Sequence, residues 1–311
     1  MLFKDIFNEK TKKLQPEFEK LREEILKKQT HDGDLLLILT NGSYEPDVHN
    51  WTNVKEDMSP YVIGPNSEGY SDHSHYDFIH NYRTKSISNL NFVDYLKLHE
   101  WSKERKTEID QLQNDESLSL QLEMLVFLKI WEADLFIKKW FQLTRLSLGE
   151  PYDWHFSIAE SNRDKEATGT RETLIRKKIR DRLESQFPEI YKTIKNAYRT
   201  QVRNSIAHSK YSFLGRNIHL NNYIKEDKAS QLHSLKFDEW IDMFHDTMVL
   251  YNQTIRLFNK ADQLYDSFAK ANNLLVEVRI NKLDPEEKTE YQILKYRPEL
   301  KDWGWYRNEK K

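Results

Sequence analysis

An arginine and a histidine stand close together in the segment Arg203-Asn204-Ser205-Ile206-Ala207-His208. A guanidinium group can bind a phosphate through two parallel hydrogen bonds, and an imidazole with a pKa of about 6.5 can exchange a proton at neutral pH. The pair therefore suits acid–base chemistry on a phosphodiester. The Arg-x4-His spacing alone carries little information, because so short a pattern recurs by chance.

The residues before this segment predict the helix that positions it. Pro188 suits a first helical turn, and one apolar stripe follows at helical spacing: Ile190, Tyr191, Ile194, Ala197, Tyr198 and Val202. If Arg203 is set at 0°, His208 lies at about 140°, and the stripe covers about 120° to 300°. The polar side chains would thus border the buried face, with the small Ala207 between them. A simpler role for an Arg and a His at a helix end is to bind the last carbonyl groups.

The string Arg203-Asn204-Ser205-Ile206-Ala207-His208-Ser209 resembles the Arg-Asn-x-x-Ala-His motif of HEPN ribonucleases, above all the abortive-infection and antiviral proteins of bacteria. The resemblance covers residues 117–271. It implies a metal-independent RNA endonuclease without a cofactor, whose helical bundle forms a homodimer along the motif face. His208 would be the general base on a ribose 2′-hydroxyl or the general acid on the leaving oxygen. Arg203 would stabilise the pentavalent phosphate, and Asn204 would orient His208 or contact phosphate. Two protomers would build one composite site that leaves a 2′,3′-cyclic phosphate.

Further candidates for RNA contact lie on either side of the motif. Arg176, Lys177 and Arg180 belong to a basic helix over residues 171–182 that we predict to follow single-stranded RNA or tRNA. The alternative is a solvated helix face that pairs with acidic neighbours. Tyr211 and Arg216, just downstream of the motif, are predicted to line the cleft, although Tyr211 also suits the core.

Acidic residues near the middle of the chain are candidates to hold the motif. Glu132 and Asp134 lie within a strongly apolar segment, and HEPN domains often carry an acidic residue in their first helix. Either carboxylate is expected to hold Arg203 or His208. An ordinary position at a polar helix edge is the alternative.

Other kinds of site lack support in the sequence. The spacing His73-x-His75-x4-His80, with Asp72 and Asp77, has no partner motif, so we predict no metal site. Walker, dinucleotide-binding, nucleophile-elbow and HExxH patterns are absent, which leaves kinases, serine hydrolases and zincins unsupported. Cysteine is absent, which excludes disulfides and thiolate chemistry. The net charge of −2 means that any RNA binding needs a local basic patch.

The pattern of apolar residues predicts a predominantly all-α protein. With 311 residues, 13% of them aromatic, the chain can build a large core. We expect helices over residues 10–28, 118–148 and 237–268, and helical patterning over 76–106. We expect an irregular excursion over 41–75 and a helix cap at Asn114–Ser117. Residues 35–39 suit a strand or a helix equally well. Residues 274–280 and 290–296 alternate like two strands of a hairpin around Asp284-Pro285.

We therefore predict three regions: an irregular, helical N-terminal region (1–115), a HEPN-like four-helix bundle (116–271) and a β-hairpin appendage (272–311). The function that we predict is antiviral or stress-defence RNA cleavage, with residues 1–115, a regulatory partner or an activating ligand as the control. The alternatives are a non-catalytic HEPN-like module for dimerisation, nucleotide binding or toxin neutralisation, and a helical scaffold. No apolar run approaches the roughly 20 residues that cross a bilayer, and no signal peptide is recognisable, so the cytoplasm is the expected location.

Overall fold

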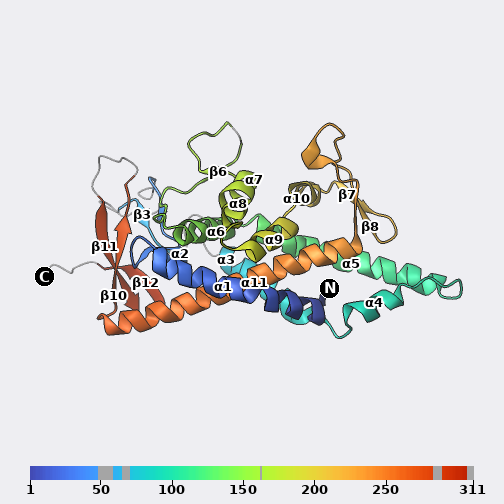
Figure 1. The fold of residues 1–311 in the computed structure, drawn as a ribbon, viewed down its shortest axis with the longest axis horizontal. Coiled ribbons are helices and arrows are strands. Elements are labelled where there is room, and N and C mark those ends of the chain that lie inside the picture. Colours follow the sequence, from blue (N-terminus) through green and yellow to red (C-terminus); the bar gives the residue numbers. More distant parts are fainter. Residues whose placement is uncertain (48–58, 65–70, 162, 283–288, 307–311) are drawn as a thin grey trace. The chain divides into compact units, whose positions relative to one another are not determined.

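The computed structural model describes residues 1–47, 59–64, 71–161, 163–282 and 289–306, and helices dominate it (Figure 1). About 57% of the structure is helical, and the strands form small sheets. None of the helices in the described ranges combines the length and apolar character needed to span a bilayer.

The chain forms two compact units, each drawn from three stretches. The first unit comprises Met1–Glu17, His73–Ala133 and Leu183–Gln253, and the second comprises Phe18–Asp72, Asp134–Arg182 and Thr254–Lys311. This grouping cuts across the predicted regions 1–115, 116–271 and 272–311. The physical reason is that α1 (Lys4–Lys28) and α11 (Phe237–Ala271) each contribute residues to both units.

The two long helices follow the predicted patterns. In α1 the residues Leu14, Phe18, Leu21 and Ile25 form an apolar stripe at helical spacing and are buried, and the helix begins before the expected residue 10. In α11 the helix continues three residues past the predicted end at Phe268. For these two helices, amphipathic spacing over several turns correctly predicted the helix.

The first unit surrounds the motif with helices and two small sheets. Its elements are β1 (Leu2–Phe3), most of α3 (Ser71–Lys85), β4 (Ile87–Ser88), α4 (Phe92–Leu98), α5 (Lys106–Trp131), α9 (Pro188–Ala197), α10 (Thr200–Ala207), β7 (Tyr211–Phe213), β8 (Asn217–Leu220), the 3-10 turn η3 (Lys228–Ser230) and β9 (Ser234–Lys236). Strands β1 and β4 pair in parallel, and Phe3 packs with Tyr95 and Ile241.

The predicted helix cap at Asn114–Ser117 is wrong, because α5 passes through it without interruption. Glu116 is buried there, and the hydroxyl of Ser117 donates to the carbonyl of Gln113 within the helix. The polar cluster is therefore an interior stretch of the helix and not its end.

The single helix predicted over 118–148 is also wrong, because α5 ends at Trp131 and α6 (Asp134–Ser147) begins two residues after Glu132. No Gly or Pro marks this break, so the apolar pattern runs on across it. Leu122 and Leu125, which belong to this apolar pattern, are each 45% exposed, since the buried face of α5 is narrower than the pattern suggests.

The motif helix is shorter than predicted. Pro188 does occupy the first turn of α9, but α9 ends at Ala197, and Tyr198 and Arg199 are extended before α10 begins. Tyr198 is buried, with its ring 5.1 Å from that of Trp131. The chain turns here because burial of this ring outweighs continuation of the helix.

An antiparallel three-stranded sheet, which the sequence did not predict, follows the motif. Its order is β7-β8-β9, and Ser212, His219 and Ser234 are in register across it. Side chains alternate between the faces of a sheet, so Ile218 and Leu235 lie together on the opposite, buried face.

The second unit combines short helices with paired strands. Its elements are α2 (Asp34–Leu39), β2 (Ser43–Tyr44), β3 (Tyr61–Val62), α6, β5 (Ile158–Ala159), β6 (Gly169–Thr170), α7 (Arg171–Thr173), a π-helical segment η2 (Leu174–Arg180) and most of α8 (Asp181–Leu183). Residues 35–39, for which the sequence suited a strand and a helix equally well, are helical and belong to α2.

A three-stranded antiparallel sheet ends the described chain. It contains β10 (Leu275–Ile280), β11 (Glu290–Arg297) and β12 (Asp302–Trp305), in that order. The alternating segments at 274–280 and 290–296 correspond to β10 and β11, and β12 is an additional strand. The turn predicted at Asp284-Pro285 and much of the 41–75 excursion lie outside the described residues.

Candidate functional site

The motif lies on α10, whose two faces differ sharply. Gln201, Val202, Ser205 and Ile206 are buried, which leaves the opposite side of the helix to the motif residues. Gln201 anchors the helix through a paired amide contact with Leu232, in which its Nε2 donates at 2.8 Å and its Oε1 accepts at 2.9 Å. The helix packs against α5. The face that carries the motif is thus held in place from beneath.

Arg203 is held by the carboxylate of Glu132. Its Nη2 donates to Oε2 of Glu132 at 2.5 Å, and its Nε pairs with Oε1. Its Nη1 donates to Oδ1 of Asn204 at 2.7 Å. The expectation that Glu132 holds Arg203 is confirmed, whereas Asp134 instead accepts from Arg171 in the second unit.

His208 ends α10 and presents a free imidazole. The His208 side chain is exposed and, within the described ranges, has no hydrogen-bond or ion-pair partner. The amide of Asn204 contacts Arg203, so the predicted orientation of His208 by that amide is not what the structure has. The backbone N–H of His208 donates instead to the carbonyl of Asn204 at 3.1 Å.

The turn after His208 is well defined. Ser209 adopts a left-handed conformation with φ of 52°, and its N–H donates to the carbonyl of Ile206 at 3.1 Å. The N–H of Lys210 donates to the carbonyl of Ser205 at 2.7 Å, and the hydroxyl of Ser205 donates to the carbonyl of Lys210. These bonds form a Schellman cap, in which glycine is the usual residue at the position of Ser209.

The arrangement can bind an anion and move a proton. Arg203 and His208 are five residues apart on one helix, so their backbones are separated by about 7.5 Å along its axis. A phosphodiester can lie between them, with the guanidinium on a phosphate oxygen and the imidazole on a ribose or leaving oxygen. The carboxylate of Glu132 neutralises the charge of Arg203, so a phosphate must compete with this carboxylate for the guanidinium.

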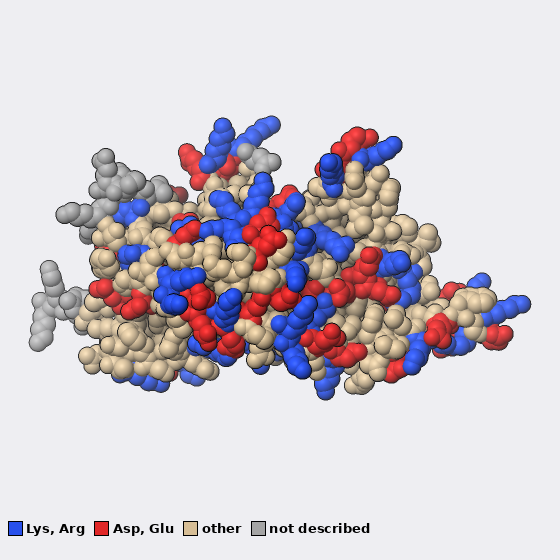
Figure 2. Space-filling view, in the orientation of Figure 1, with Lys and Arg blue, Asp and Glu red and all other residues tan. Residues whose placement is uncertain are grey.

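The predicted RNA-binding basic helix belongs to the second unit and is largely paired internally. Arg176 donates to Glu172 at 2.5 Å, and Arg180 donates to Asp181 at 2.7 Å. Lys177 is exposed and has no ion pair among the described residues. Figure 2 shows Lys and Arg atoms intermixed with Asp and Glu atoms over the visible face. The contacts favour the acid-paired, solvated helix face over a basic track.

Arg216, predicted to contact RNA, is bound by carboxylates of its own unit. Its Nη2 and Nε donate to the buried Glu116 at 2.7 and 2.9 Å, and Nη2 also pairs with Asp238 at 2.9 Å. These bonds tie the β7–β8 turn to α5 and the start of α11. Tyr211 pairs in register with Leu220, and its ring packs edge-on against Phe213. Both residues therefore have contacts that a structural role explains.

The histidines considered for a metal site, His73, His75 and His80, lie on α3. Within the ranges that the structure describes, no three His, Asp or Glu side chains gather as ligands. The side chains of Asp72 and His73 lie outside those described. The ring of His80 stacks on Tyr76 at 5.7 Å between centroids.

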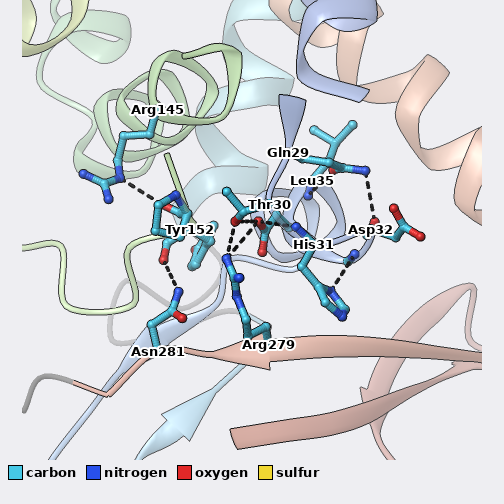
Figure 3. A network of polar contacts seen from close by, with 12 residues as sticks. Gln29, Thr30, His31, Asp32, Leu35, Arg145, Tyr152, Arg279 and Asn281 are labelled. Atoms are coloured by element: carbon cyan, nitrogen blue, oxygen red, sulfur yellow. Dashed lines mark hydrogen bonds and ion pairs between the residues drawn. The ribbon is translucent and has the colours of Figure 1, made fainter. Parts of the chain in front are cut away.

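A buried polar network in the second unit was missed by sequence reasoning (Figure 3). Asp34 is fully buried, and its Oδ2 accepts from the hydroxyl of Thr30 at 2.8 Å and the N–H of His31 at 3.1 Å. Arg279 reaches from β10 to the hydroxyl of Thr30 and lies 3.7 Å from Asp34. Burial raises the pKa of Asp34, although the Thr30 hydrogen bond opposes this. The network links the α1–α2 turn to β10, which accounts for it as a structural element.

A buried histidine, His245 on α11, lies in the core of the first unit. Its Nε2 accepts from the N–H of Phe3 at 2.8 Å, and its Nδ1 lies 2.7 Å from the carbonyl of Ile241. The ring is therefore neutral, with its proton on Nδ1. Desolvation by burial lowers the pKa of His245 to about 4.

No protein-family model matches the chain, and comparisons with curated proteins and with solved structures find no similar protein.

Proposed function

We propose that this chain is a metal-independent endoribonuclease of the HEPN type that cleaves RNA on the outward face of α10. Arg203 binds the reacting phosphate and stabilises its added negative charge. His208 transfers the proton between the ribose 2′-hydroxyl or the leaving oxygen and solvent. Asn204 positions the guanidinium through its hydrogen bond to Arg203.

The observation that carries this proposal is the division of labour on α10. Arg203 is held in place by two side chains, while His208, on the exposed end of the same helix, has no competing partner within the described chain. A structural pair at a helix end would be expected to bind the helix carbonyls through both side chains. Within the described residues, neither the Arg203 nor the His208 side chain bonds to a helix carbonyl.

Two wider inferences accompany the proposal. We assign α5, α9, α10 and the first part of α11, all within the first unit, to a HEPN-like bundle. We also infer that two chains join their motif faces into a composite site, and that cleavage serves antiviral or stress defence in the cytoplasm. Residues 1–115 or a separate activating ligand would then control the activity.

The test compares the full-length wild type with Arg203→Ala and His208→Ala on labelled single-stranded RNA and on total tRNA, in EDTA. The control variants Arg105→Ala and His80→Ala remove the same side-chain types from exposed or half-exposed positions elsewhere in the first unit. We expect the wild type and the controls to cut, leaving 2′,3′-cyclic phosphate ends, and both motif variants to lose at least a hundredfold in rate.

Growth on induction is scored in parallel, since an activator that is absent from the tube would be present in the cell. Equal behaviour of all five proteins in both assays would refute the ribonuclease. A binding module that uses the same face would then be the better description. Circular dichroism of each variant establishes that a loss of activity is not a loss of folding.

A further inference from the structure

The sheet that follows the motif has one polar face. On this face Ser212, His219 and Ser234 lie side by side across β7, β8 and β9. Lys236 pairs in register with Asn217 on the same face, because both are two residues from members of that row. The opposite face carries apolar residues such as Ile218 and Leu235, which are buried. The sheet thus presents hydroxyl, imidazole and ammonium donors to solvent.

Lys210 extends this face toward the motif. The N–H of Asn221 donates to the carbonyl of Lys210 at 2.9 Å, which continues the β7–β8 ladder by one residue. Alternation then puts Lys210 on the face of Ser212 and His219. Lys210 follows His208 by two residues, so their Cα atoms are at most about 7 Å apart.

The lysines of this segment differ from Arg216 in that they have no ion-pair partner among the described residues. Lys210 and Lys236 are exposed, and the ammonium groups of both have no ion pair among the described residues. Two further exposed lysines, Lys225 and Lys228, lie between β8 and β9, again without an ion pair in the described chain. Arg216, by contrast, is bound by two carboxylates. Unpaired cations are the ones that can exchange their counterions for phosphate.

We propose that the polar face of β7–β8–β9, with Lys210 and Lys236 as its cations, binds the sugar–phosphate backbone of the RNA strand that leads into the site. This inference rests on the proposed ribonuclease function and names where its substrate lies. The strands are three or four residues long and adjacent strands are about 4.8 Å apart, so the face measures about 10 Å each way. It therefore fits a few nucleotides of a single strand and not the length of a duplex that double-stranded RNA modules cover.

The experiment measures RNA binding by full-length protein in which His208→Ala prevents cleavage. A fluorescent 12-nucleotide single-stranded RNA is titrated at several salt concentrations, with Lys210→Gln and Lys236→Gln introduced together. The matched control combines Lys12→Gln with Lys103→Gln, which removes two exposed lysines of the first unit that lie outside the sheet and have no ion pair in the described chain.

The slope of log affinity against log salt is negative, and loss of two phosphate contacts should make it shallower by about 1.4, since each single-strand contact contributes about −0.7. The control should keep the parent slope. An unchanged slope in the sheet variant overturns the inference. The inference also fails if the single substitution Lys177→Gln makes the slope shallower while the sheet variant does not. A parent protein without salt-dependent RNA binding overturns it too.

Cleavage by the active enzyme separates this failure from that of the proposed function. For cleavage, Lys210→Gln and Lys236→Gln are introduced into the protein with an intact His208. If Arg203→Ala and His208→Ala abolish cutting while this double variant cuts as the wild type does, and the sheet variant in the uncleaving background binds as its parent does, the ribonuclease stands and the RNA lies elsewhere. If no protein cuts or is toxic, the ribonuclease itself fails.

Discussion

Acidification should weaken the first unit through His245. The ring is fully buried and neutral, with one nitrogen accepting from Phe3 and the other bonded to Ile241. A proton added at Nε2 would face the N–H of Phe3, a donor opposite a donor. Burial holds the pKa of His245 at about 4, below its usual 6.5.

The direction and size of this destabilisation follow from the linkage between proton binding and folding. Because the folded pKa is the lower one, the unfolded chain binds the proton more readily, and acid favours unfolding. The stability that the neutral His245 ring contributes to the folded state is fully present above about pH 6.5 and is lost as the pH falls toward 4. A difference of about 2.5 pH units corresponds to about 3 kcal/mol of unfolding free energy.

The assay is urea unfolding, followed by circular dichroism, at pH 7, 6, 5 and 4.5 for the wild type and for His245→Gln. The glutamine amide can still accept from Phe3, but it does not titrate in this range. Carboxyl groups titrate in both proteins alike, so the difference between the two profiles reports on His245. We expect the wild type to lose about 2 to 3 kcal/mol more than the variant between pH 7 and 4.5. Parallel profiles would refute the assignment of this pH dependence to His245.

Three further changes test other parts of the structure. Ser209→Gly should raise the unfolding free energy by about 0.5–1 kcal/mol in urea titrations, because glycine adopts positive φ without strain; a decrease would contradict the strained cap. Gly33→Ala should cost about 2 kcal/mol, since the new Cβ would overlap the backbone oxygen of Glu277, and thermal melts that match the wild type would exclude that clash. In the uncleaving His208→Ala background, Glu132→Gln should tighten RNA binding about two- to fivefold by removing the carboxylate that competes for Arg203. Weaker binding would mean that Glu132 serves to hold the guanidinium in place.

Local patterns were sufficient for the long, regular elements. The stripe of α1, the extent of α11 and the start of α9 at Pro188 could all be predicted, because each depends on neighbours within a few turns. The same spacing placed Arg203 and His208 near a helix end. Glu132 was nominated, together with Asp134, as a partner for Arg203 or His208 through the HEPN resemblance and not through a local pattern.

Breaks in helices were not predictable in this way. Helix α5 ends at Trp131 and helix α9 ends at Ala197, yet neither break contains Gly or Pro. At Tyr198 the burial of a ring against Trp131 decides the conformation. The carboxylate of Glu132 pairs with Arg203, which lies 71 positions later in the chain. A local pattern contains no information about partners so distant.

The role of a charged side chain was also decided by tertiary structure alone. From the sequence, Arg216 was predicted to be free to contact RNA. In the fold it is bound by Glu116, which lies 100 residues earlier in the chain. A signal did exist, since Glu116 and Glu123 share the helical spacing of the buried Leu120 and Phe127. An acidic residue on an apolar face implies a partner, because an unpaired buried charge is costly. The sequence thus determined that α5 needed partners for its buried carboxylates and that α10 carried an Arg and a His. Only the packing of distant segments decided which cations were neutralised and which remained free, because ion pairing depends on distances that a linear chain does not define.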